Sequence, residues 1–379
     1  MKVRAAILDA VGLEAPFATS SPVHIYDLEL AAPGPGEVLI RVEAAGVCHS
    51  DLSRLTGDRA VRVPMVLGHE ACGIVEQLGD DVHGIAVGDK ATMTFMPRCG
   101  GCDACLSPSW RLCERGLVAN ADGTLLNGAR RFARDGVPID HHGGVSAFAE
   151  YIVADQHSVV VIPHQIPSGV GALLGCAVLT GGGAVVNAGR LQEGQSVAIV
   201  GMGGVGLAAA LVAAGAGASS VTAIDTNPEK LKTALSVAAT DAMTPDEASG
   251  SGRRFDLVIE CVGHPAALAT AIAVTDVGGR TVTIGLPRPG TTIEVDPLAL
   301  VLDARSIVGS YMGSGVPSDD IRRYARMYLE GSLNVERLIT GTTNLDAINT
   351  AMDRLRDGLE IRQIVTFGAP DITVEGAQR

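Results

Sequence analysis

The stretch SVAIVGMGGVGLAAALVAAGAGASSVTAID, residues 196–225, decides the fold of this chain. Its apolar start, 197–200, predicts a buried strand, which a glycine-rich turn joins to a helix of Ala and Leu. A second short strand, 220–224, ends at an acid, Asp225. Strand, glycine turn, helix, strand and acid in this order predict a βαβ unit that binds a dinucleotide.

The three glycines of this turn have separate predicted tasks. Gly201 permits a tight turn, Gly203 lets backbone N–H groups approach a pyrophosphate, and Gly206 allows the helix to pack closely on the strand. The helix N-terminus adds a partial positive charge for the phosphates. Asp225 is placed to accept hydrogen bonds from the ribose hydroxyls and to repel a 2′-phosphate, so the expected coenzyme is NAD.

Two other interpretations of this stretch stay open. A glycine-rich segment between a strand and a helix can be only a turn, and the 22 residues 197–218 carry no charge, as in a membrane span. Against a span, the run consists largely of Gly and Ala and lacks basic or aromatic flanks. The order of the elements favours the nucleotide site.

Composition narrows the function. At 379 residues the chain is expected to hold two domains, and 47% hydrophobic residues suffice for their cores. A formal net charge of −13 argues against nucleic acid and anionic membranes as partners. The N-terminal sequence MKVRAAILDA lacks the apolar core and cleavage site of a signal peptide. We therefore expect a cytoplasmic protein that acts on a small molecule.

Four of the eight cysteines crowd into 15 residues, as Cys99, Cys102, Cys105 and Cys113. Four thiolates in one loop can close a tetrahedral zinc site with no open position, so a structural metal is expected. A redox CxxC motif holds only two cysteines and opens a helix within a βαβ unit. The usual ferredoxin spacings also differ from these, which disfavours an iron–sulfur cluster.

Cys48, His69 and Cys176 are candidates for a second metal site, because thiolate and imidazole are ligands that zinc prefers. Taken singly, each residue has a more ordinary interpretation. A lone cysteine is usually a small core residue, and a lone histidine is usually hydrogen-bonded within the structure. The spacing alone does not show that the three side chains meet.

The rest of the chain divides into a β-rich part and an alternating part. Strands are expected at 3–10, 37–46, 72–79, 88–95, 144–163, 256–263, 280–285 and 362–367. Helices are expected at 168–190, 266–275, 319–331 and 345–357. Residues 114–143 are expected to form a long polar connection, and 369–379 a frayed end. The alternation after residue 196 predicts a doubly wound parallel sheet.

Several motifs together carry a family resemblance. In chain order they are GVCHSD, GHE, the four-cysteine cluster, LLGCAVLTGGGAVVN, GMGGVG and EIRQIVTF. From about residue 3 to 368 the chain resembles the zinc-dependent alcohol dehydrogenases of the medium-chain dehydrogenase/reductase family. The resemblance implies a GroES-like, β-rich catalytic domain at 1–177 and 314–379. It also implies a Rossmann NAD-binding domain inserted at 178–313.

The resemblance implies two zinc ions per subunit, one structural and one catalytic. The catalytic ion would be held by Cys48, His69 and Cys176 and would lower the pKa of a bound alcohol before hydride moves to NAD. The catalytic residues it implies are Cys48, Ser50, Asp51, His69, Glu70 and Cys176. Ser50 would begin a proton relay, Asp51 would orient the imidazole of His69, and Glu70 would be a carboxylate near the metal.

The resemblance also implies a coenzyme site. Its expected residues are His49, Thr180, Gly201, Gly203, Gly204, Val205, Gly206, Asp225, Lys230 and Arg362. His49 and Arg362 would bind the pyrophosphate, while Thr180 and Val205 would flank the nicotinamide.

The chain departs from the family pattern at three places. Ser53 stands where many relatives have a histidine that ends the proton relay, so the proton must leave through water or His49. His142 and Gly143 replace bulky apolar residues of the substrate channel, which predicts a wider or more polar pocket. Leu117 stands where formaldehyde dehydrogenases that use a thiol adduct have an arginine.

The expected activity is reversible hydride transfer between NAD and a primary alcohol, aromatic or long-chain. A formaldehyde dehydrogenase that depends on a thiol adduct is one alternative, with Arg59 or Arg115 in place of the missing arginine. A nucleotide-binding relative without catalysis is another, although the complete zinc set argues against it. The long segment 114–143 resembles the dimeric branch, so a homodimer is expected, with a tetramer as the alternative.

Overall fold

The computed structural model describes residues 1–107 and 110–368. Its contacts divide the chain into two units. The first unit contains Met1–Cys176, Val316–Leu329 and the chain from Ile339 onward, and the second contains Ala177–Gly315 and Glu330–Leu338. The segment Glu330–Leu338, which the sequence analysis assigned to the catalytic domain, belongs to the second unit because its end packs on helix α7. The expected frayed end, 369–379, lies outside the described residues.

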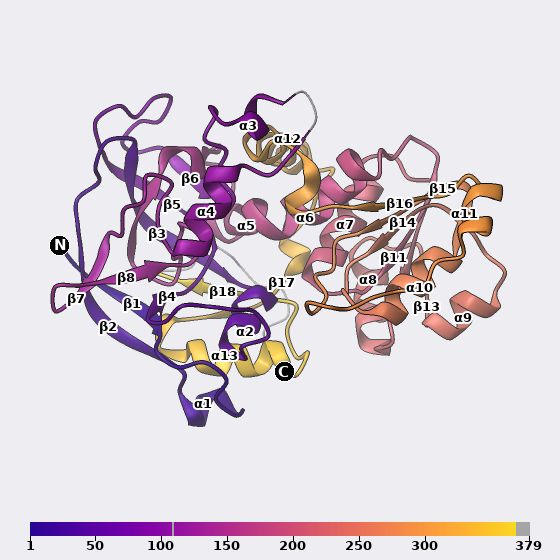
Figure 1. Ribbon diagram of the computed structural model, residues 1–379, viewed down its shortest axis with the longest axis horizontal. Coiled ribbons are helices and arrows are strands. Elements are labelled where there is room, and N and C mark those ends of the chain that lie inside the picture. The colour runs from indigo at the N-terminus through magenta and orange to yellow at the C-terminus, as the bar shows by residue number, and fades with distance from the viewer. Residues whose placement is uncertain (108–109, 369–379) are drawn as a thin grey trace. The chain divides into compact units, whose positions relative to one another are not determined.

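The first unit is built from β-strands (Figure 1). One set closes into a barrel in the order β1 (Lys2–Leu8), β2 (Val23–Leu30), β7 (Phe132–Arg134), β8 (Val137–His141) and β4 (Met65–Val66). The second set is a seven-stranded sheet, ordered β10 (Val159–Val161), β6 (Lys90–Met93), β5 (Glu70–Leu78), β3 (Glu37–Val47), β18 (Arg362–Thr366) and β17 (Ile339–Thr343), with β9 (Tyr151–Asp155) paired to β3. Ile7, Leu28, Ile40 and Phe148 are among its largest buried side chains.

Short helices connect and cover these strands. They are α1 (Phe17–Ser20), α2 (His49–Leu55), α3 (Asp103–Leu106), α4 (Glu114–Asp122), η1 (Gln156–Ser158), α5 (Ser168–Leu173), α12 (Pro317–Leu329), η6 (Leu345–Ala347) and α13 (Ile348–Arg356). A π-helical turn, η2 (Leu174–Val178), continues α5.

Two expectations about the first unit are wrong. The segment 114–143 is not a plain connection, because it contains α4, β7 and β8. Helix α4 begins where the Cys113 thiol accepts a hydrogen bond from the N–H of Gly116, and Phe132 and Ile139 fix the two strands by being buried. The expected strands at 3–10 and 37–46 also do not follow one another, since β2 lies between β1 and β3.

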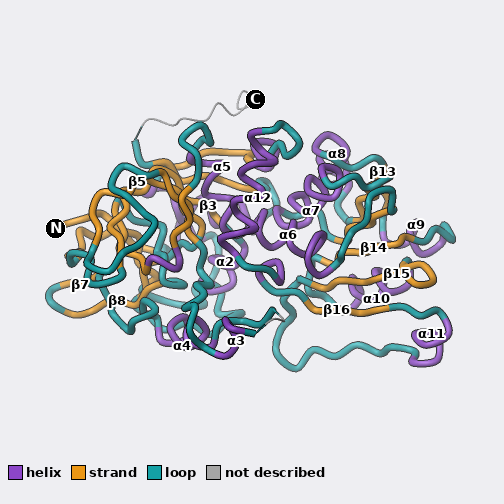
Figure 2. Tube along the Cα trace, turned by 90° about the horizontal axis from the view of Figure 1, so that it is seen from above, coloured by secondary structure: helices purple, strands orange, loops and turns teal. Residues whose placement is uncertain are grey.

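The second unit has a six-stranded parallel sheet. Its order is β13 (Asp241–Met243), β12 (Ser220–Ile224), β11 (Ser196–Val200), β14 (Phe255–Glu260), β15 (Thr275–Thr283) and β16 (Ser306–Gly309). This is the strand order of dinucleotide-binding folds, with the reversal between β11 and β14. Figure 2 shows β14, β15 and β16 side by side with helices on either side. The predicted fold class, a doubly wound parallel sheet with a β-rich domain, is confirmed.

Helices pack along this sheet in two sets: α7 contacts α8, α10 contacts α9, and both α7 and α10 pack on β11 and β14. The helices are α6 (Leu179–Gly183), η3 (Ala184–Ala188), α7 (Gly204–Gly215), α8 (Pro228–Val237), α9 (Pro245–Gly250), α10 (Pro265–Ala273), α11 (Pro297–Leu302), η4 (Met312–Ser314) and η5 (Val335–Leu338). Four of them begin with a capping side chain followed by proline: Asn227-Pro228, Thr244-Pro245, His264-Pro265 and Asp296-Pro297. The capping side chain accepts a hydrogen bond from a backbone N–H of the first turn. Proline has no N–H, so it leaves no donor unpaired there, and the local sequence therefore sets these helix starts.

One helical run has the length and composition of a membrane span. It covers Ser168–Ala188 with a mean hydropathy of 1.8, and 89% of its apolar window is buried inside the protein. Such burial is typical of a core helix. The uncharged run 197–218 is split between strand β11 and the 12-residue helix α7, and neither is long enough to cross a bilayer.

Candidate functional site

The pairing of two strands brings Cys48 and His69 together. Strands β3 and β5 are antiparallel with Gly46 opposite Glu70, so the residue after β3 lies beside the residue before β5. The ligand atoms of Cys48, His69, Glu70 and Cys176 all lie within 4.8 Å of one another, and all four residues are buried. The structure therefore assembles the three residues that the sequence could only nominate.

Cys176 reaches this cluster on the π-helical turn η2. A Cβ atom on the preceding residue, Gly175, would lie 1.9 Å from the carbonyl oxygen of Met93 in β6. Only glycine lets the turn approach the strand this closely. Single π-helical turns are frequent at functional sites, and here the turn brings a thiol to the cluster.

His69 presents an unpartnered nitrogen within this cluster. Its Nδ1 lies 3.1 Å from Oδ1 of Asp51, while its buried Nε2 has no hydrogen-bond partner among the described residues. Asp51 also accepts the backbone N–H of Cys48 at 3.0 Å. Although burial alone would raise it, the pKa of Asp51 is held well below its usual value by His69 and His142. The charged carboxylate thus accepts a hydrogen bond from Nδ1–H of His69, which leaves Nε2 as the nitrogen that could bind a metal ion.

Glu70 and Arg362 form the charged side of the cluster. Burial raises the pKa of Glu70 to about 7, against the opposing effect of Arg362, whose guanidinium lies 3.5 Å from Oε1. Arg362 is 3% exposed and also donates to the carbonyl of Val47. A Cβ at Gly46 would lie 2.1 Å from Oε2 of Glu70, so glycine makes room for the carboxylate. The pyrophosphate role of Arg362 stays a prediction.

The chemistry of this donor set fits zinc. Two thiols, one imidazole with a free lone pair and one carboxylate are ligands that Zn²⁺ prefers. The pKa of Cys48 lies well below its usual value, first because it accepts a hydrogen bond from Cys176 and further because of Arg362 and His69. A lowered thiol pKa favours the thiolate form that binds metal. A bound ion would also satisfy the orphaned Nε2 of His69.

The second cluster, Cys99, Cys102, Cys105 and Cys113, has ligand atoms within 4.8 Å of one another. The Sγ atoms of Cys99 and Cys105 are 4.0 Å apart, and those of Cys102 and Cys113 are 3.9 Å apart. Thiolates bound tetrahedrally to zinc lie roughly 3.8 Å from one another. All four are free cysteines, and the set matches a closed tetrahedral site.

The glycine turn of the second unit has the backbone geometry of a phosphate-binding loop. Gly201 has φ +97°, a conformation that favours glycine. A Cβ at Gly206 would lie 1.9 Å from the carbonyl oxygen of Gly201, so only glycine allows α7 to start this close to β11. Gly203 is the N-cap residue of α7, and a Cβ on it would meet nothing within 4 Å. No side chain caps the first turn of this helix. Its N–H groups can therefore face an anion.

Asp225 closes this unit's βαβ motif at the end of β12. Its carboxylate accepts the backbone N–H of Met202 at 2.7 Å and that of Asn227 at 2.9 Å. Each carboxylate oxygen has a second lone pair, so Asp225 can also accept from ribose hydroxyls. The same two bonds fix the carboxylate beside the glycine turn.

The other predicted residues are placed as follows. His49 and Ser50 form the first turn of α2, with His49 exposed and Ser50 half-buried. The Ser53 hydroxyl donates to the carbonyl of His49, so it is engaged with the backbone. Thr180 lies in α6 with its hydroxyl 3.8 Å from the Met312 sulfur. Gly204 and Val205 lie in the first turn of α7, and Lys230 in α8 is half-buried.

His142 differs from its expected role. Its Nε2 accepts a hydrogen bond from Nε of Arg54 at 2.8 Å, and its Nδ1 lies 3.2 Å from Oδ1 of Asp51. Because burial, together with Arg54, lowers its pKa to about 4, the ring is neutral near pH 7. Nε2 is bonded to Arg54, and Nδ1 is buried without a hydrogen bond of standard geometry; because only 3% of the residue is exposed, His142 offers little polarity to a pocket. The sequence drew attention to His142, but nothing in it pointed to Arg54.

Two aromatic rings pack on His69. The His142 ring lies 4.7 Å from it, and the Phe95 ring meets it edge-on at 5.1 Å. Gly143 has φ +61°, and a Cβ there would lie 2.6 Å from Cβ of Phe95. The glycine therefore lets Phe95 approach the loop that carries His142, and the surroundings of His69 are aromatic.

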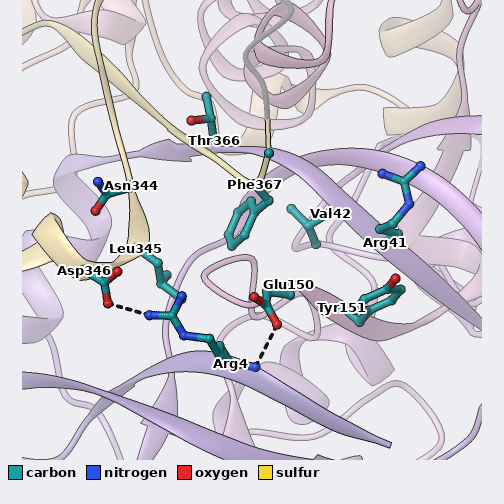
Figure 3. Close-up of a pocket in the computed structure, with 11 residues that line it drawn as sticks. Arg4, Arg41, Val42, Glu150, Tyr151, Asn344, Leu345, Asp346, Thr366 and Phe367 are labelled. Carbon is teal, nitrogen blue, oxygen red and sulfur yellow. Dashed lines mark hydrogen bonds and ion pairs between the residues drawn. The ribbon is translucent and has the colours of Figure 1, made fainter.

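A cavity of about 300 Å³ in the first unit lies among other residues (Figure 3). Among its charged residues, the Arg4 side chain contacts Asp346 at 2.6 Å, and the Arg4 backbone N–H donates to Glu150 at 3.2 Å. None of its lining residues belongs to the cysteine clusters or the glycine turn. No chemistry is assigned to it.

Comparison with known proteins agrees with this geometry. Residues 34–164 match the model of the alcohol dehydrogenase GroES-like domain, and residues 204–330 match that of the zinc-binding dehydrogenases. "Putative alcohol dehydrogenase D" of Mycobacterium tuberculosis is 36% identical over 376 residues, which cover 96% of this chain and 100% of the relative.

Two solved structures are similar over the whole chain. An alcohol dehydrogenase zinc-binding domain protein from Burkholderia ambifaria has a TM-score of 0.90 at 31% identity. Benzyl alcohol dehydrogenase from Acinetobacter calcoaceticus has a TM-score of 0.89 at 28% identity. Each alignment covers 97% of this chain and 100% of the other.

Proposed function

This chain belongs to the zinc-binding alcohol dehydrogenases of the medium-chain dehydrogenase/reductase family, and we propose that it oxidises a primary alcohol reversibly with NAD. The observation that carries the proposal is the buried cluster of Cys48, His69 and Cys176. Its thiols and the unpartnered Nε2 of His69 form a three-ligand set with Glu70 nearby. Three protein ligands and an open position are typical of catalytic zinc.

The residues around the cluster have defined tasks in the proposed reaction. Zinc bound there supplies the Lewis acidity that lowers the pKa of an alcohol, and NAD supplies the hydride acceptor. Asp51 holds His69 so that Nε2 remains available. The Ser50 hydroxyl, two residues after Cys48, would accept the alcohol proton while giving its own proton to His49 or water. Because the Ser53 hydroxyl is bonded to the His49 carbonyl, it has no assigned part in this transfer.

We propose an aromatic or long-chain primary alcohol as the substrate. The half-buried Phe95 packs edge-on against His69, so an aromatic or apolar group would find an aromatic ring beside the cluster. The similarity to benzyl alcohol dehydrogenase from Acinetobacter calcoaceticus supports the same class. Benzyl alcohol and hexanol are therefore the first substrates to test.

The proposed function is tested by NADH formation. Wild-type protein with benzyl alcohol or hexanol is expected to reduce NAD, and Cys48→Ala is expected to abolish this while its circular dichroism and melting curve stay native. Cys72→Ala is a matched control, because Cys72 is also a buried cysteine of the first unit but lies outside both clusters. Activity that survives Cys48→Ala would contradict the zinc mechanism.

The proposed assembly is a homodimer, on the basis of the long segment 114–143, and the proposed location is the cytoplasm. Light scattering on the purified protein tests the oligomeric state, and a mass of one or four subunits would contradict it.

A further inference from the structure

A row of buried polar contacts leads from helix α2 to the proposed catalytic cluster. Arg54, in the last turn of α2, donates from Nε to Nε2 of His142 at 2.8 Å. Nδ1 of His142 lies 3.2 Å from Oδ1 of Asp51, and the same oxygen lies 3.1 Å from Nδ1 of His69. His142 is 3% exposed, and Asp51 and His69 are equally buried. The row thus ends on a proposed zinc ligand.

The direction of these contacts is fixed by Arg54. A guanidinium only donates hydrogen bonds, so Nε2 of His142 must present its lone pair. A neutral imidazole carries one proton, and here it must therefore sit on Nδ1, facing Asp51. The angle at this contact is poorer than in a standard hydrogen bond, although the distance is within range.

Asp51 then faces three N–H groups. Those of His69 and of the Cys48 backbone are hydrogen-bonded to it, and Nδ1 of His142 lies within reach at 3.2 Å. A third donor restricts the orientation of a buried carboxylate further than two donors do. Since a partner at Nδ1 sets the tautomer and direction of a metal-binding imidazole, fixing Asp51 also fixes where Nε2 of His69 points.

We propose that His142 is a positioning residue of the metal site, which Arg54 locks in one tautomer so that it holds Asp51 and, through Asp51, His69. The inference rests on the proposed zinc site at Cys48, His69 and Cys176. It concerns a residue of the loop after β8, for which the sequence offered only a pocket-lining role.

Two other interpretations make different predictions. By distance alone, Asp51, His69 and His142 could themselves hold a metal ion. A metal ion at that place would need the lone pair on Nδ1 of each histidine. Because the bond from Arg54 leaves the proton of His142 on Nδ1, this metal site is disfavoured. His142 could also act only as a buried filler of the loop, in which case removing its nitrogens would leave the metal site unchanged.

The test compares zinc release from full-length holoprotein variants to a chelating dye. His142→Phe keeps a ring and removes both nitrogens, whereas His142→Gln keeps one donor and one acceptor. We expect His142→Phe to weaken the binding of one zinc by about 10- to 100-fold, and His142→Gln to restore most of it. The zinc of the four-cysteine cluster should be released at the wild-type rate in every variant.

His141→Phe is the matched control. His141, the last residue of β8 and the neighbour of His142, is also fully buried, but its nitrogens contact the N–H of Arg131 and the hydroxyl of Ser146, which do not belong to the metal cluster. Its zinc release should equal that of the wild type. Wild-type release from His142→Phe, or His142→Gln releasing as fast as His142→Phe, would overturn the inference.

Two further measurements separate the possible failures. If His142→Phe does not fold, nitrogen NMR of histidine-labelled wild type can still determine the tautomer of His142. A proton on Nδ1 is expected, and a proton on Nε2 would overturn the inference. Cobalt in the catalytic site reports geometry directly, and its visible spectrum should change in His142→Phe but not in His141→Phe.

A wild type that holds only one zinc, in the four-cysteine cluster, would contradict the proposed function as well. Two zinc ions with unchanged release in His142→Phe would contradict the inference alone.

Discussion

Gly175→Ala should damage the proposed catalytic site without touching any proposed ligand. The new Cβ would lie 1.9 Å from the carbonyl oxygen of Met93, whereas real Cβ contacts essentially never fall below 3.0 Å. The turn η2 would therefore have to move from β6 by about 1 Å, and it carries Cys176 with it. Overpacking of this kind typically lowers the free energy of unfolding by about 1–3 kcal/mol.

The assay for this variant has two readouts, denaturant unfolding and zinc content. We expect lower stability and partial loss of one zinc, because a ligand displaced by about 1 Å no longer matches a bond of about 2.3 Å. Gly250→Ala is the control, since a Cβ at this exposed end of α9 would meet nothing within 4 Å. It should leave both readouts unchanged or slightly improve stability. A Gly175→Ala protein with native stability and full zinc content would refute the packing argument.

Three further outcomes are expected. Asp225→Ser should raise the ratio of kcat/KM for NADP over NAD by about tenfold or more, because it removes the repulsion of the 2′-phosphate, and a wild type that uses both coenzymes equally would contradict the role of Asp225. Burial lowers the pKa of His141 to about 3 from 6.5, so the unfolded chain binds a proton that the folded chain does not, and stability should fall as pH drops from about 6.5 toward 3. His141→Gln should make that fall shallower in urea unfolding at several pH values, and an unchanged slope would count against it. Cys102→Ala should release the zinc of the four-cysteine cluster and lower the melting temperature while the other zinc is retained, and loss of both ions by metal analysis would show that the sites are not independent.

The fold was predictable because its signals are local. The stretch 196–225 shows strand, turn and helix by hydrophobic pattern, and Gly201 and Gly206 stand where the backbone requires glycine. Proline and a capping residue mark four helix starts in the second unit in the same local way. Such features depend on neighbours in sequence, so one chain suffices to find them.

The segment 114–143 was not predictable for the opposite reason. Strands β7 and β8 are short, and they exist because they pair with β2 and β4 of the barrel, which are distant in sequence. Helix α4 begins at Cys113 of the metal cluster, so its start depends on a site and not on a periodic pattern. Polar composition alone made the segment resemble a connection.

In the candidate site too, residue types could be predicted from the sequence, whereas contacts between distant segments could not. Residue types nominated Cys48, His69 and Cys176, but their meeting depends on the β3–β5 register and on the approach that Gly175 permits. The link from Arg54 to His142 crosses from a helix to a distant loop, and no spacing in the sequence encodes it.

We propose above all that Cys48, His69 and Cys176 hold a catalytic zinc separate from the four-cysteine site. The direct test is metal analysis of the purified protein, expressed per subunit. We expect two zinc ions in the wild type and one in a natively folded Cys48→Ala variant. One zinc in the wild type, or two retained after Cys48→Ala, would contradict it.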